Sequence, residues 1–448
     1  MNQSVYLVAG IGKTGRSIAA FLRRRNLPFV VFDTRTEVEG LTEFTRDFPG
    51  VDIFLGELPP SVYPELKAII ASPGVAMDDP VFAEVHRLKI PVIGDIECFA
   101  REVRAPVIAI TGTNGKSTVT TLVGEMARAA GLEVAVAGNI GLPVLDLIDS
   151  GKHYDLWVLE LSSFQLDLID SLAPVAATVL NISPDHLDRH HSLAAYSAAK
   201  QRIYRQAKVL IHSRDDNQTY PVLPQANLSP VITSFGLDEP TGENWGIIHK
   251  DGKDYLSHGD NALLAVDELR LKGKQNWQNV LAACALAHAA GIEPHHMLSV
   301  LRTFSGLPHR CQWVRTLDGV DWINDSKGTN VGATISAISG IGGSIKGQIV
   351  LIAGGLGKGA DFSEMQAPVN EFVRAVVLIG KDADSIEKAL DGVVPVFHAN
   401  SLEAAMLRAR SEAKSGDVVL LSPACASQDM FRDFNHRGES FANLAGLL

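Results

Sequence analysis

The residues best suited to chemistry lie in the stretch AITGTNGKST, which follows an apolar run and precedes a helical pattern. The stretch matches the phosphate-binding template G-x-x-x-x-G-K-[ST], except that Ile110 stands where the template has its first glycine. Such loops hold phosphate by backbone N–H groups, by a lysine and by a hydroxyl on magnesium. Gly112, Gly115, Lys116 and Ser117 keep all of these parts, so the stretch predicts a phosphate-binding loop.

Two later segments supply candidate metal ligands. Glu160 ends the apolar run LWVLE, and P-loop enzymes keep an acidic metal ligand at such a strand tip. The segment NISPDHLDRHHS gathers acidic and imidazole side chains in one loop: Asp185, His186, Asp188, His190 and His191. His186, nearest the preceding strand, is the best ligand candidate, although a histidine cluster is also typical of a solvated surface. Lys200, in the next helical pattern, is by itself an ordinary surface lysine.

A second glycine-rich loop lies near the N-terminus. Gly10, Gly12 and Gly15 follow a strand pattern and open a helical one, and Asp33 ends the next strand. This context is typical of a dinucleotide site, where the acid binds a ribose hydroxyl. A UDP group satisfies the same geometry, and a tight turn without a ligand is a third interpretation. The segment ASPG, ending at Gly74, follows another strand, where ligands collect in open α/β sheets.

The elements that must position these loops alternate between short β-branched runs and helical patterns. This alternation predicts a parallel α/β fold, and 448 residues suggest three domains. We expect a Rossmann-like domain over 1–100, a central P-loop domain with a mainly parallel sheet over 101–307, and a Rossmann-like domain over 308–448. The segment HKDGKDYL predicts a hairpin at the edge of the central sheet.

Composition excludes several classes of protein. A formal net charge of -11 argues against non-specific nucleic-acid binding. The 4 cysteines form no C-x-x-C pair, so neither a zinc knuckle nor a disulfide framework is expected. The N-terminus enters a strand pattern at once, and no apolar run approaches the ~20 residues of a membrane span. We therefore expect a cytoplasmic protein without a signal peptide or a membrane span.

Taken together, these motifs resemble those of the Mur ligases, ATP-dependent amide-bond-forming enzymes of peptidoglycan synthesis. The resemblance covers essentially the whole chain and rests on TGTNGKST, NISPDHLDRH, YSAAK, the His309-Arg310 pair and NDSKGTN. The segment SPACASQDMF is similar to that of the member that adds D-glutamate, as are GIGKTG, DTR and SPG in the first domain. The D-N-P-R motif of the diamino-acid-adding member is absent.

The resemblance implies an ATP site and a metal site in the central domain. The implied ATP-binding residues are Gly112, Thr113, Asn114, Gly115, Lys116, Ser117, Thr118, Asn276, Asn279, Arg310, Asp325 and Lys327. Two Mg²⁺ ions would lie among Ser117, Glu160, His186 and Lys200, with Lys200 carbamylated because a bare ammonium would repel a cation. Lys116, Glu160, His186 and Lys200 would form the catalytic group. Gln275 stands where the family usually has histidine, which affects details of nucleotide contact.

The resemblance also implies sites for two small-molecule substrates, UDP-N-acetylmuramoyl-L-alanine and D-glutamate. The UDP substrate would be bound by Lys13, Thr14, Asp33, Thr34, Arg35, Ser72, Gly74, Asn139 and His186. D-glutamate would be bound by Lys327, Thr329, Lys358, Ser427 and Phe434. The glycines around Lys358 also fit another phosphate loop, but the amino-acid role is preferred because two nucleotide sites are already filled.

The implied reaction passes through an acyl phosphate made from ATP and the alanine carboxylate, which the amine of D-glutamate then attacks. His186 is a possible proton acceptor for that amine, although a metal-bound role competes. The enzyme is expected to be a monomer. Three alternatives remain: a sibling ligase for another amino acid, an NAD or FAD oxidoreductase built on Gly10–Gly15, and a P-loop GTPase. The GTPase is disfavoured because no N-K-x-D motif is present.

Overall fold

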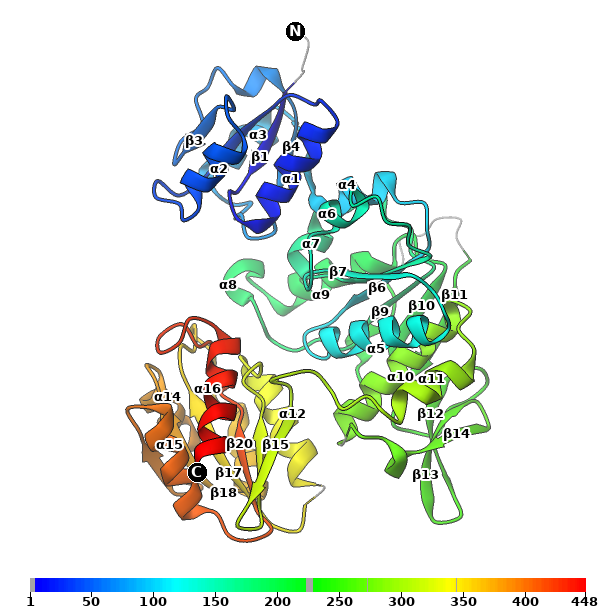
Figure 1. Ribbon diagram of the computed structural model, residues 1–448, viewed down its shortest axis with the longest axis vertical. Coiled ribbons are helices and arrows are strands. Elements are labelled where there is room, and N and C mark those ends of the chain that lie inside the picture. Colours follow the sequence, from blue (N-terminus) through cyan, green and yellow to red (C-terminus); the bar gives the residue numbers. More distant parts are fainter. Residues whose placement is uncertain (1–4, 223–228, 272, 344) are drawn as a thin grey trace.

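The computed structural model describes residues 5–222, 229–271, 273–343 and 345–448. Met1–Ser4, which open the predicted first domain, lie outside the described residues. Figure 1 shows three α/β bodies that follow one another along the chain, so the predicted three-domain α/β fold is confirmed. Helix α4 (Asp95–Glu102) runs across the predicted boundary at residue 100, so the exact division there remains a proposal.

The first domain contains a five-stranded sheet in the order β3-β2-β1-β4-β5, with all neighbours parallel. Its strands are β1 (Val5–Ala9), β2 (Phe29–Asp33), β3 (Ile53–Leu55), β4 (Leu66–Ala71) and β5 (Val92–Gly94). Its helices are α1 (Lys13–Arg24), α2 (Leu41–Asp47), the 3-10 turn η1 (Tyr63–Glu65) and α3 (Pro80–Arg87). The strand order reverses between β1 and β4, which is where open α/β sheets bind ligands.

The central domain contains a nine-stranded sheet in the order β14-β13-β12-β11-β10-β9-β6-β8-β7. Its strands are β6 (Val107–Thr111), β7 (Val134–Gly138), β8 (Leu156–Glu160), β9 (Ala176–Val179), β10 (Val209–Ser213), β11 (Val231–Phe235), β12 (Trp245–Lys250), β13 (Lys253–His258) and β14 (Asn261–Ala265). Its helices are α5 (Lys116–Ala129), α6 (Val144–Ile148), α7 (Ser163–Asp167), α8 (Leu187–His190), α9 (Leu193–Gln201), α10 (Lys274–Ala289) and α11 (Pro294–Leu301), with 3-10 turns η2 (Arg202–Tyr204), η3 (Asn217–Thr219) and η4 (Val266–Glu268).

The predicted hairpin at the edge of this sheet is confirmed. β12 and β13 are antiparallel, with Lys250 opposite Lys253. The two residues between them, Asp251 and Gly252, have φ angles of 52° and 73°. Positive φ at both central residues is the geometry of a tight hairpin turn, for which Asp-Gly is well suited.

The third domain contains a six-stranded sheet in the order β15-β16-β20-β17-β18-β19, parallel except for the β15–β16 pair. Its strands are β15 (Gln312–Leu317), β16 (Val320–Asn324), β17 (Ile349–Gly354), β18 (Val373–Ile379), β19 (Val396–His398) and β20 (Val418–Leu421). Its helices are α12 (Val331–Gly342), the 3-10 turn η5 (Ser363–Met365), α13 (Gln366–Phe372), α14 (Ala383–Leu390), α15 (Leu402–Glu412) and α16 (Phe434–Leu447).

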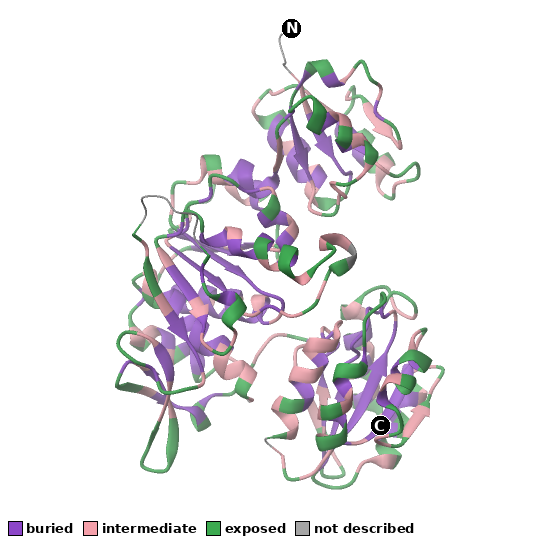
Figure 2. Cartoon of the chain, turned by 180° about the vertical axis from the view of Figure 1, so that it is seen from behind, coloured by how far each residue is buried: buried purple, intermediate pink, exposed green. Residues whose placement is uncertain are grey.

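In all three domains the central strands are buried, as the purple arrows of Figure 2 show. Apolar residues such as Ile108, Val158 and Leu351 are fully buried within these strands, because helices cover the faces of each sheet. Because the covered parts of the strands are apolar, polar residues lie at the carboxyl ends of the strands, and the predicted site residues lie there too. Within the described residues, no helix has the length and apolar character that crossing a membrane requires.

The turn from β1 to α1 depends on a glycine in direct contact with the backbone. A Cβ on Gly15 would lie 1.8 Å from the carbonyl oxygen of Gly10, whereas a Cβ on Gly12 would meet nothing within 4 Å. Helix α1 can therefore approach β1 only because Gly15 lacks a side chain. This is the role of the third glycine in such turns.

We predict that Gly15→Ala destabilises the protein by about 3 kcal/mol, because the clashing atom is a backbone oxygen that cannot rotate away. Gly12→Ala should be as stable as the wild type, because Gly12 has a φ angle of -66° and its Cβ would face open space. Urea unfolding followed by circular dichroism measures both. Equal stability of the two variants would contradict the packing argument.

Candidate active site

The phosphate-binding loop joins β6 to α5. Gly112 and Gly115 have φ angles of 152° and 84°, a region that favours glycine. A Cβ on Gly115 would lie 2.2 Å from Oδ1 of Asn279, so α10 closes over the loop. Ile110 lies inside β6, fully buried, and pairs with Glu160 of β8 and Thr178 of β9. The first glycine of the template is therefore unnecessary, because position 110 is ordinary strand.

The cationic side chains of the predicted ATP site come from two domains. Lys116 Nζ donates to the carbonyl oxygens of Gly112 and Thr113 at 2.8 and 2.7 Å. Arg310, at the start of the third domain, donates to Ser117 Oγ at 2.7 Å. Burial lowers the pKa of Lys116, while the carboxylate of Glu160 acts in the opposite direction. Lys116 and Arg310 thus lie within the electrostatic reach of one another and of Glu160.

A small cavity of about 70 Å³ lies between the loop and the third domain. Its lining contains all five of the residues predicted for ATP outside the loop itself, together with several neighbours: Asn114, Gly115, Thr118, Gln275, Asn276, Asn279, Arg310, Cys311, Asp325, Lys327, Gly328 and Ala333. The fully buried Asp325 accepts from the Cys311 amide at 3.1 Å and from Ser422 Oγ at 2.7 Å. Burial raises the pKa of Asp325 to about 6 despite these bonds.

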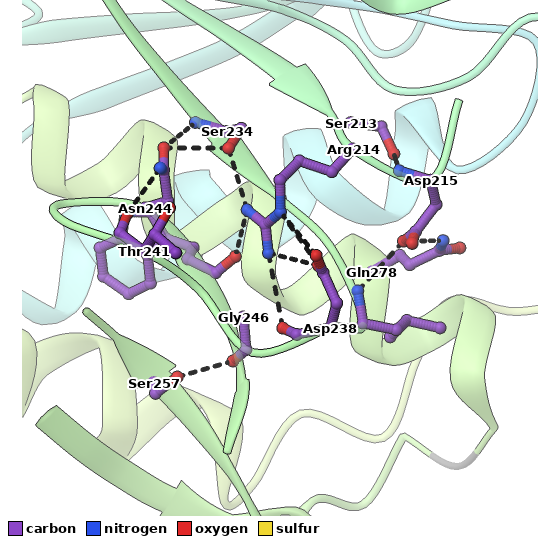
Figure 3. Close-up of polar contacts among 12 residues, drawn as sticks. Ser213, Arg214, Asp215, Ser234, Asp238, Thr241, Asn244, Gly246, Ser257 and Gln278 are labelled. Carbon is purple, nitrogen blue, oxygen red and sulfur yellow. Dashed lines mark hydrogen bonds and ion pairs between the residues drawn. The ribbon is translucent and has the colours of Figure 1, made fainter. Parts of the chain in front are cut away.

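A larger groove of about 870 Å³ adjoins this cavity and shares Asn114 and Gln275 with it. It runs between the start of α10 and helix α12, and Trp277 and Phe372 are its large side chains. The start of α10 is anchored to the loop after β10, because Gln278 donates to Asp215 Oδ2 at 2.6 Å. Figure 3 shows this bond beside Arg214, whose guanidinium ties the strands after β10 together through Asp238 and Ser234.

Glu160 has a feature that fits a bound cation. Its side chain is 2% exposed, and Oε1 accepts from Asn139 Nδ2 at 2.9 Å. Oε2 is buried and has no hydrogen-bond donor among the described residues. A buried carboxylate oxygen without a partner is costly, and carboxylate oxygens are ligands that Mg²⁺ prefers. The donor set at Glu160 therefore fits a divalent metal.

Lys200 is not a surface lysine, so the interpretation based on this residue alone was wrong. The side chain is 2% exposed, and Nζ donates to the Gly112 carbonyl at 2.9 Å. Nζ also lies 4.5 Å from the centre of the Tyr196 ring. Burial, and then the positive charge of Lys116, hold the pKa of Lys200 well below its usual value. The lowered pKa favours the neutral amine, and the neutral amine is the form that reacts with carbon dioxide.

The histidine-rich loop serves more than one purpose. His186 begins α8 with φ 53° and packs edge-on against the Phe164 ring at 5.0 Å. Its side chain is 48% exposed, and its Nε2 lies 3.8 Å from Asp185 Oδ2. His190 instead packs inward, with Nε2 2.9 Å from Ser163 Oγ. The His186 side chain is thus half-exposed, whereas His190 supports the loop.

The third cavity, of about 560 Å³, lies between the first and central domains. Its lining includes eight of the nine residues predicted for the UDP substrate: Lys13, Thr14, Asp33, Thr34, Arg35, Ser72, Gly74 and Asn139. The ninth, His186, is not part of this lining. Lys13 Nζ donates to the Gly141 carbonyl at 2.9 Å and so ties the two domains together at the cavity.

Asp33 makes a different set of contacts from those of a dinucleotide site. Its carboxylate accepts from the Ile11 amide at 3.0 Å and from Arg35 Nε and Nη2 at 2.8 and 2.9 Å. Burial alone would raise the pKa of Asp33, but these hydrogen bonds hold it below its usual value. The carboxylate is occupied by Arg35, so it positions that side chain at the cavity and does not stand ready for a ribose hydroxyl.

Sequence reasoning missed two further polar side chains of this cavity, those of Asp95 and Gln165. Asp95 is 5% exposed, and its Oδ1, like Oγ of Ser72, has no hydrogen-bond partner among the described residues. Burial raises the pKa of Asp95 to about 6. Asp95 opens helix α4, where an acid is common simply because it complements the helix dipole, so the sequence carried no distinctive signal.

The residues predicted for D-glutamate gather at one end of the third sheet. Lys327 Nζ lies 3.8 Å from the Phe434 ring centre. Burial lowers the pKa of Lys327 to about 8, and nearby Arg310 acts in the same direction. A bridge between Leu356 and Ala426 brings together the loops that carry Lys358, which is exposed, and Ser427, which is buried. Thr329 follows Lys327 in the loop after β16.

Sequence reasoning also missed Arg437, which supports this end of the sheet. It is 1% exposed and donates to the Ser326 carbonyl at 2.9 Å and the Cys425 carbonyl at 3.1 Å. A lone arginine in an amphipathic helical pattern gives no sign of such burial. Its bonds fix the backbone beside Lys327 and near Ser427.

Comparison with family models covers the three domains in order. Residues 4–94 match the model "Mur ligase MurD-like, N-terminal domain", residues 110–287 match "Mur ligase middle domain", and residues 309–425 match "Mur ligase, glutamate ligase domain".

Curated relatives match over nearly the full length. A UDP-N-acetylmuramoylalanine--D-glutamate ligase of Legionella pneumophila is 63% identical over 444 residues, covering 99% of each chain. The enzyme of the same name from Pseudomonas aeruginosa is 47% identical over 436 residues, covering 97% of this chain and 96% of the relative.

Solved structures share the fold at low sequence identity. MurF of Acinetobacter baumannii has a TM-score of 0.62 at 17% identity, covering 99% of this chain and 90% of that one. MurF of Thermotoga maritima in complex with ADP has a TM-score of 0.61 at 16% identity, covering 100% and 96%. These two likenesses establish the three-domain arrangement.

We predict that Asp95→Asn stabilises the protein in a pH-dependent way. The pKa of Asp95 is about 6 in the folded protein against an ordinary value of 3.8, so its burial cost is absent below about pH 4 and complete above about pH 7. The uncharged variant should gain about 1–3 kcal/mol near pH 8, and the gain should shrink as pH falls toward 5. Urea unfolding at several pH values measures it, with the exposed Asp52→Asn as control. A gain that does not depend on pH would refute the buried charge.

Proposed function

The chain belongs to the Mur ligase family of ATP-dependent ligases, and from this membership we propose that it joins D-glutamate to UDP-N-acetylmuramoyl-L-alanine in peptidoglycan precursor synthesis. The identity of 63% to a relative of that activity over 99% of both chains supports the choice of amino acid. ATP dependence supports a place of action in the cytoplasm, and we propose that one chain is the working unit.

One observation carries the proposal at the level of the site. Asn139 lines the cavity between the first two domains, and its side chain also donates to Glu160 beside the phosphate loop. A nucleotide-linked substrate bound in that cavity can therefore extend along Asn139 toward the ATP phosphates. The two sites are neighbours, as a reaction between a tethered carboxylate and ATP requires.

In the first step, the alanine carboxylate of the UDP substrate attacks the γ-phosphorus of ATP, giving an acyl phosphate and releasing ADP. Three cationic side chains face the region where negative charge accumulates: Lys116, Arg310 and Lys327. Their role is to hold phosphoryl oxygens, since this chemistry depends on positioning and charge stabilisation more than on a protein nucleophile. The groove at α10 and α12 has room for the base of the nucleotide, and Gln275 is among its lining residues.

In the second step, the amine of D-glutamate attacks the acyl carbon, and the tetrahedral intermediate expels phosphate. The amine must be neutral to attack. The amino acid is proposed to be held by Lys327, Thr329, Lys358, Ser427 and Phe434. The two lysines of this set would bind its carboxylates. His186, exposed beside Asp185, is a candidate to accept the proton.

The proposed metal ligands are Ser117, Glu160, His186 and carbamylated Lys200. Bound Mg²⁺ would neutralise charge on the phosphates and orient them for in-line transfer. Carbamylation joins neutral Nζ of Lys200 to the carbon of CO₂ with loss of one proton, so that starting from the ammonium form two protons are released and a cation becomes an anion. The buried and readily deprotonated amine supports this modification.

The alternatives are weaker on specific grounds. An NAD or FAD oxidoreductase needs an acid free for the ribose, but Asp33 is bound by Arg35. It also leaves the phosphate loop and buried Lys200 without a role. A sibling ligase for another amino acid is separated from the proposal only by substrate choice, which the first experiment below tests.

We predict that phosphate is released from ATP only when UDP-N-acetylmuramoyl-L-alanine and D-glutamate are both present. L-glutamate, L-lysine, L-alanine and diaminopimelate should each support less than about 1% of that rate, because an unmatched carboxylate leaves buried cations unpaired. A coupled phosphate-release assay with this panel gives the answer. Preference for another amino acid would overturn the assignment of D-glutamate while leaving a ligase in place.

We predict that Lys200→Ala lowers kcat at least about 100-fold, because a charge-stabilising group is lost. Formate, acetate or propionate should restore part of the activity by supplying the missing carboxylate. Lys116→Ala serves as matched control, since its missing group is a cation that carboxylates cannot replace. Failure of every short carboxylate to raise the rate of Lys200→Ala would argue against the carbamate.

A further inference from the structure

The short helix α8 stands apart from the body of the central domain. In Figure 1 it lies toward the space between the first and third domains. Residues in the left-handed region bound it on both sides, His186 with φ 53° and His191 with φ 61°. A positive φ angle is energetically costly for residues other than glycine, so packing must hold this segment in place.

The segment touches the other two domains through different residues. Arg189 of α8 donates through Nη2 to the carbonyl oxygen of Val75 in the first domain. Asp185, just before α8, accepts from Asn330 Nδ2 of the third domain at 3.3 Å. The amide of Ser183 donates to Thr113 Oγ1 of the phosphate loop at 3.0 Å.

Arg189 is anchored to the central domain by an aromatic side chain. Its guanidinium carbon lies 4.8 Å from the centre of the Phe164 ring in α7. The His190 ring stacks on the same Phe164 at 5.3 Å with an interplanar angle of 12°. Phe164 stands four residues after Glu160, the last residue of β8. The Phe164 ring therefore fixes the position of the Arg189 guanidinium relative to β8, and the same guanidinium contacts the first domain.

The carbonyl that Arg189 contacts belongs to a turn that forms a wall of the UDP-substrate cavity. The Val75 amide donates to the Ser72 carbonyl at 3.0 Å and closes this turn. Ser72, Gly74 and Val75 all line the cavity, and Arg189 does not. A Cβ on Gly10 would lie 3.1 Å from Val75 Cγ2, so the turn also packs against the glycine loop after β1.

A separate set of bonds already joins the first two domains elsewhere. Ser17 Oγ of α1 donates to Asp146 of α6 at 2.8 Å, and Arg25 bridges to Asp149 at 2.9 Å. These contacts join helices and do not involve the turn at 72–75. Arg189 is the contact that ties this turn to the central domain at α8.

We propose that Arg189 is a positioning residue for the UDP substrate: it holds the Ser72–Val75 turn against the central domain, and so sets the shape of the nucleotide-sugar cavity without touching the ligand. This inference rests on the proposed function for the nature of the ligand. Arginine suits the task because its flat guanidinium can lie on Phe164 while a N–H group bonds the Val75 carbonyl.

The test compares Arg189→Met with Arg205→Met, a matched loss of charge at an exposed arginine of the same domain. Arg189→Met should raise the KM for UDP-N-acetylmuramoyl-L-alanine about tenfold, as expected for one charge-assisted hydrogen bond. Its kcat, its KM values for ATP and D-glutamate, and its Tm should match those of Arg205→Met. Arg189→Lys, which keeps the charge but not the flat fork, should recover only part of the affinity.

Direct binding separates this inference from the proposed function. Calorimetric titration with the UDP substrate, without ATP, should show a tenfold loss of binding affinity for Arg189→Met, equal to the rise in KM. Phe164→Leu should weaken binding too, and adding it to Arg189→Met should cost little more, because the two side chains act as one unit.

Each outcome has one meaning. If the wild type neither binds the UDP substrate nor releases phosphate, the proposed function fails. If the wild type does both and Arg189→Met binds the UDP substrate as tightly, the positioning role is overturned. An equal rise in all three KM values, or a fall in Tm alongside the loss of binding, would show a general structural role instead.

Discussion

Crowding of four positive charges beside fewer carboxylates is the constraint on which the rest of the structure depends. Lys116, Lys200, Lys327 and Arg310 all lie in the field of Glu160, and burial lowers the pKa of each of these cations. Asp185 also acts on Lys116 and Lys200, and Asp325 acts on Arg310, but three carboxylates do not balance four cations in a poorly solvated site. Under the proposed function, the phosphates of ATP and the carboxylates of the amino acid would supply the missing negative charge.

Gathering these cations requires two domains, because no single sheet presents all of them. Lys116 and Lys200 belong to the central domain, whereas Arg310 and Lys327 belong to the third. The first domain contributes the cavity that ends at Asn139, next to Glu160. Each domain brings polar residues to the carboxyl ends of parallel strands, and the proposed reaction would take place between them. Contacts between domains, such as Arg310 to Ser117, therefore belong to the site as much as the loop does.

Local motifs could be predicted from the sequence because their chemistry depends on neighbours along the chain. The phosphate loop, the hairpin at Asp251-Gly252 and the alternating α/β pattern all fall in this group. Ile110 looked like a defect in the motif only while its place inside β6 was unknown. The same reasoning misjudged Lys200 and overlooked Asp95 and Arg437, because burial of a charged side chain depends on residues far away in the sequence.

The sequence by itself determined the order of the elements, the residues at the strand ends and, through its resemblance to a family, the kind of reaction. These properties follow from periodicity and from spacing within about 10 residues. Only the tertiary structure decided that Asp33 is occupied by Arg35, that Lys200 is buried under the phosphate loop, and that α8 reaches from the central domain to Val75. Asp33 and Arg35 are neighbours along the chain, but only the folded loop shows that their side chains pair. The other two facts depend on which helices and loops meet in space, and local pattern carries no information about such meetings because packing joins segments as far apart as residues 75 and 189.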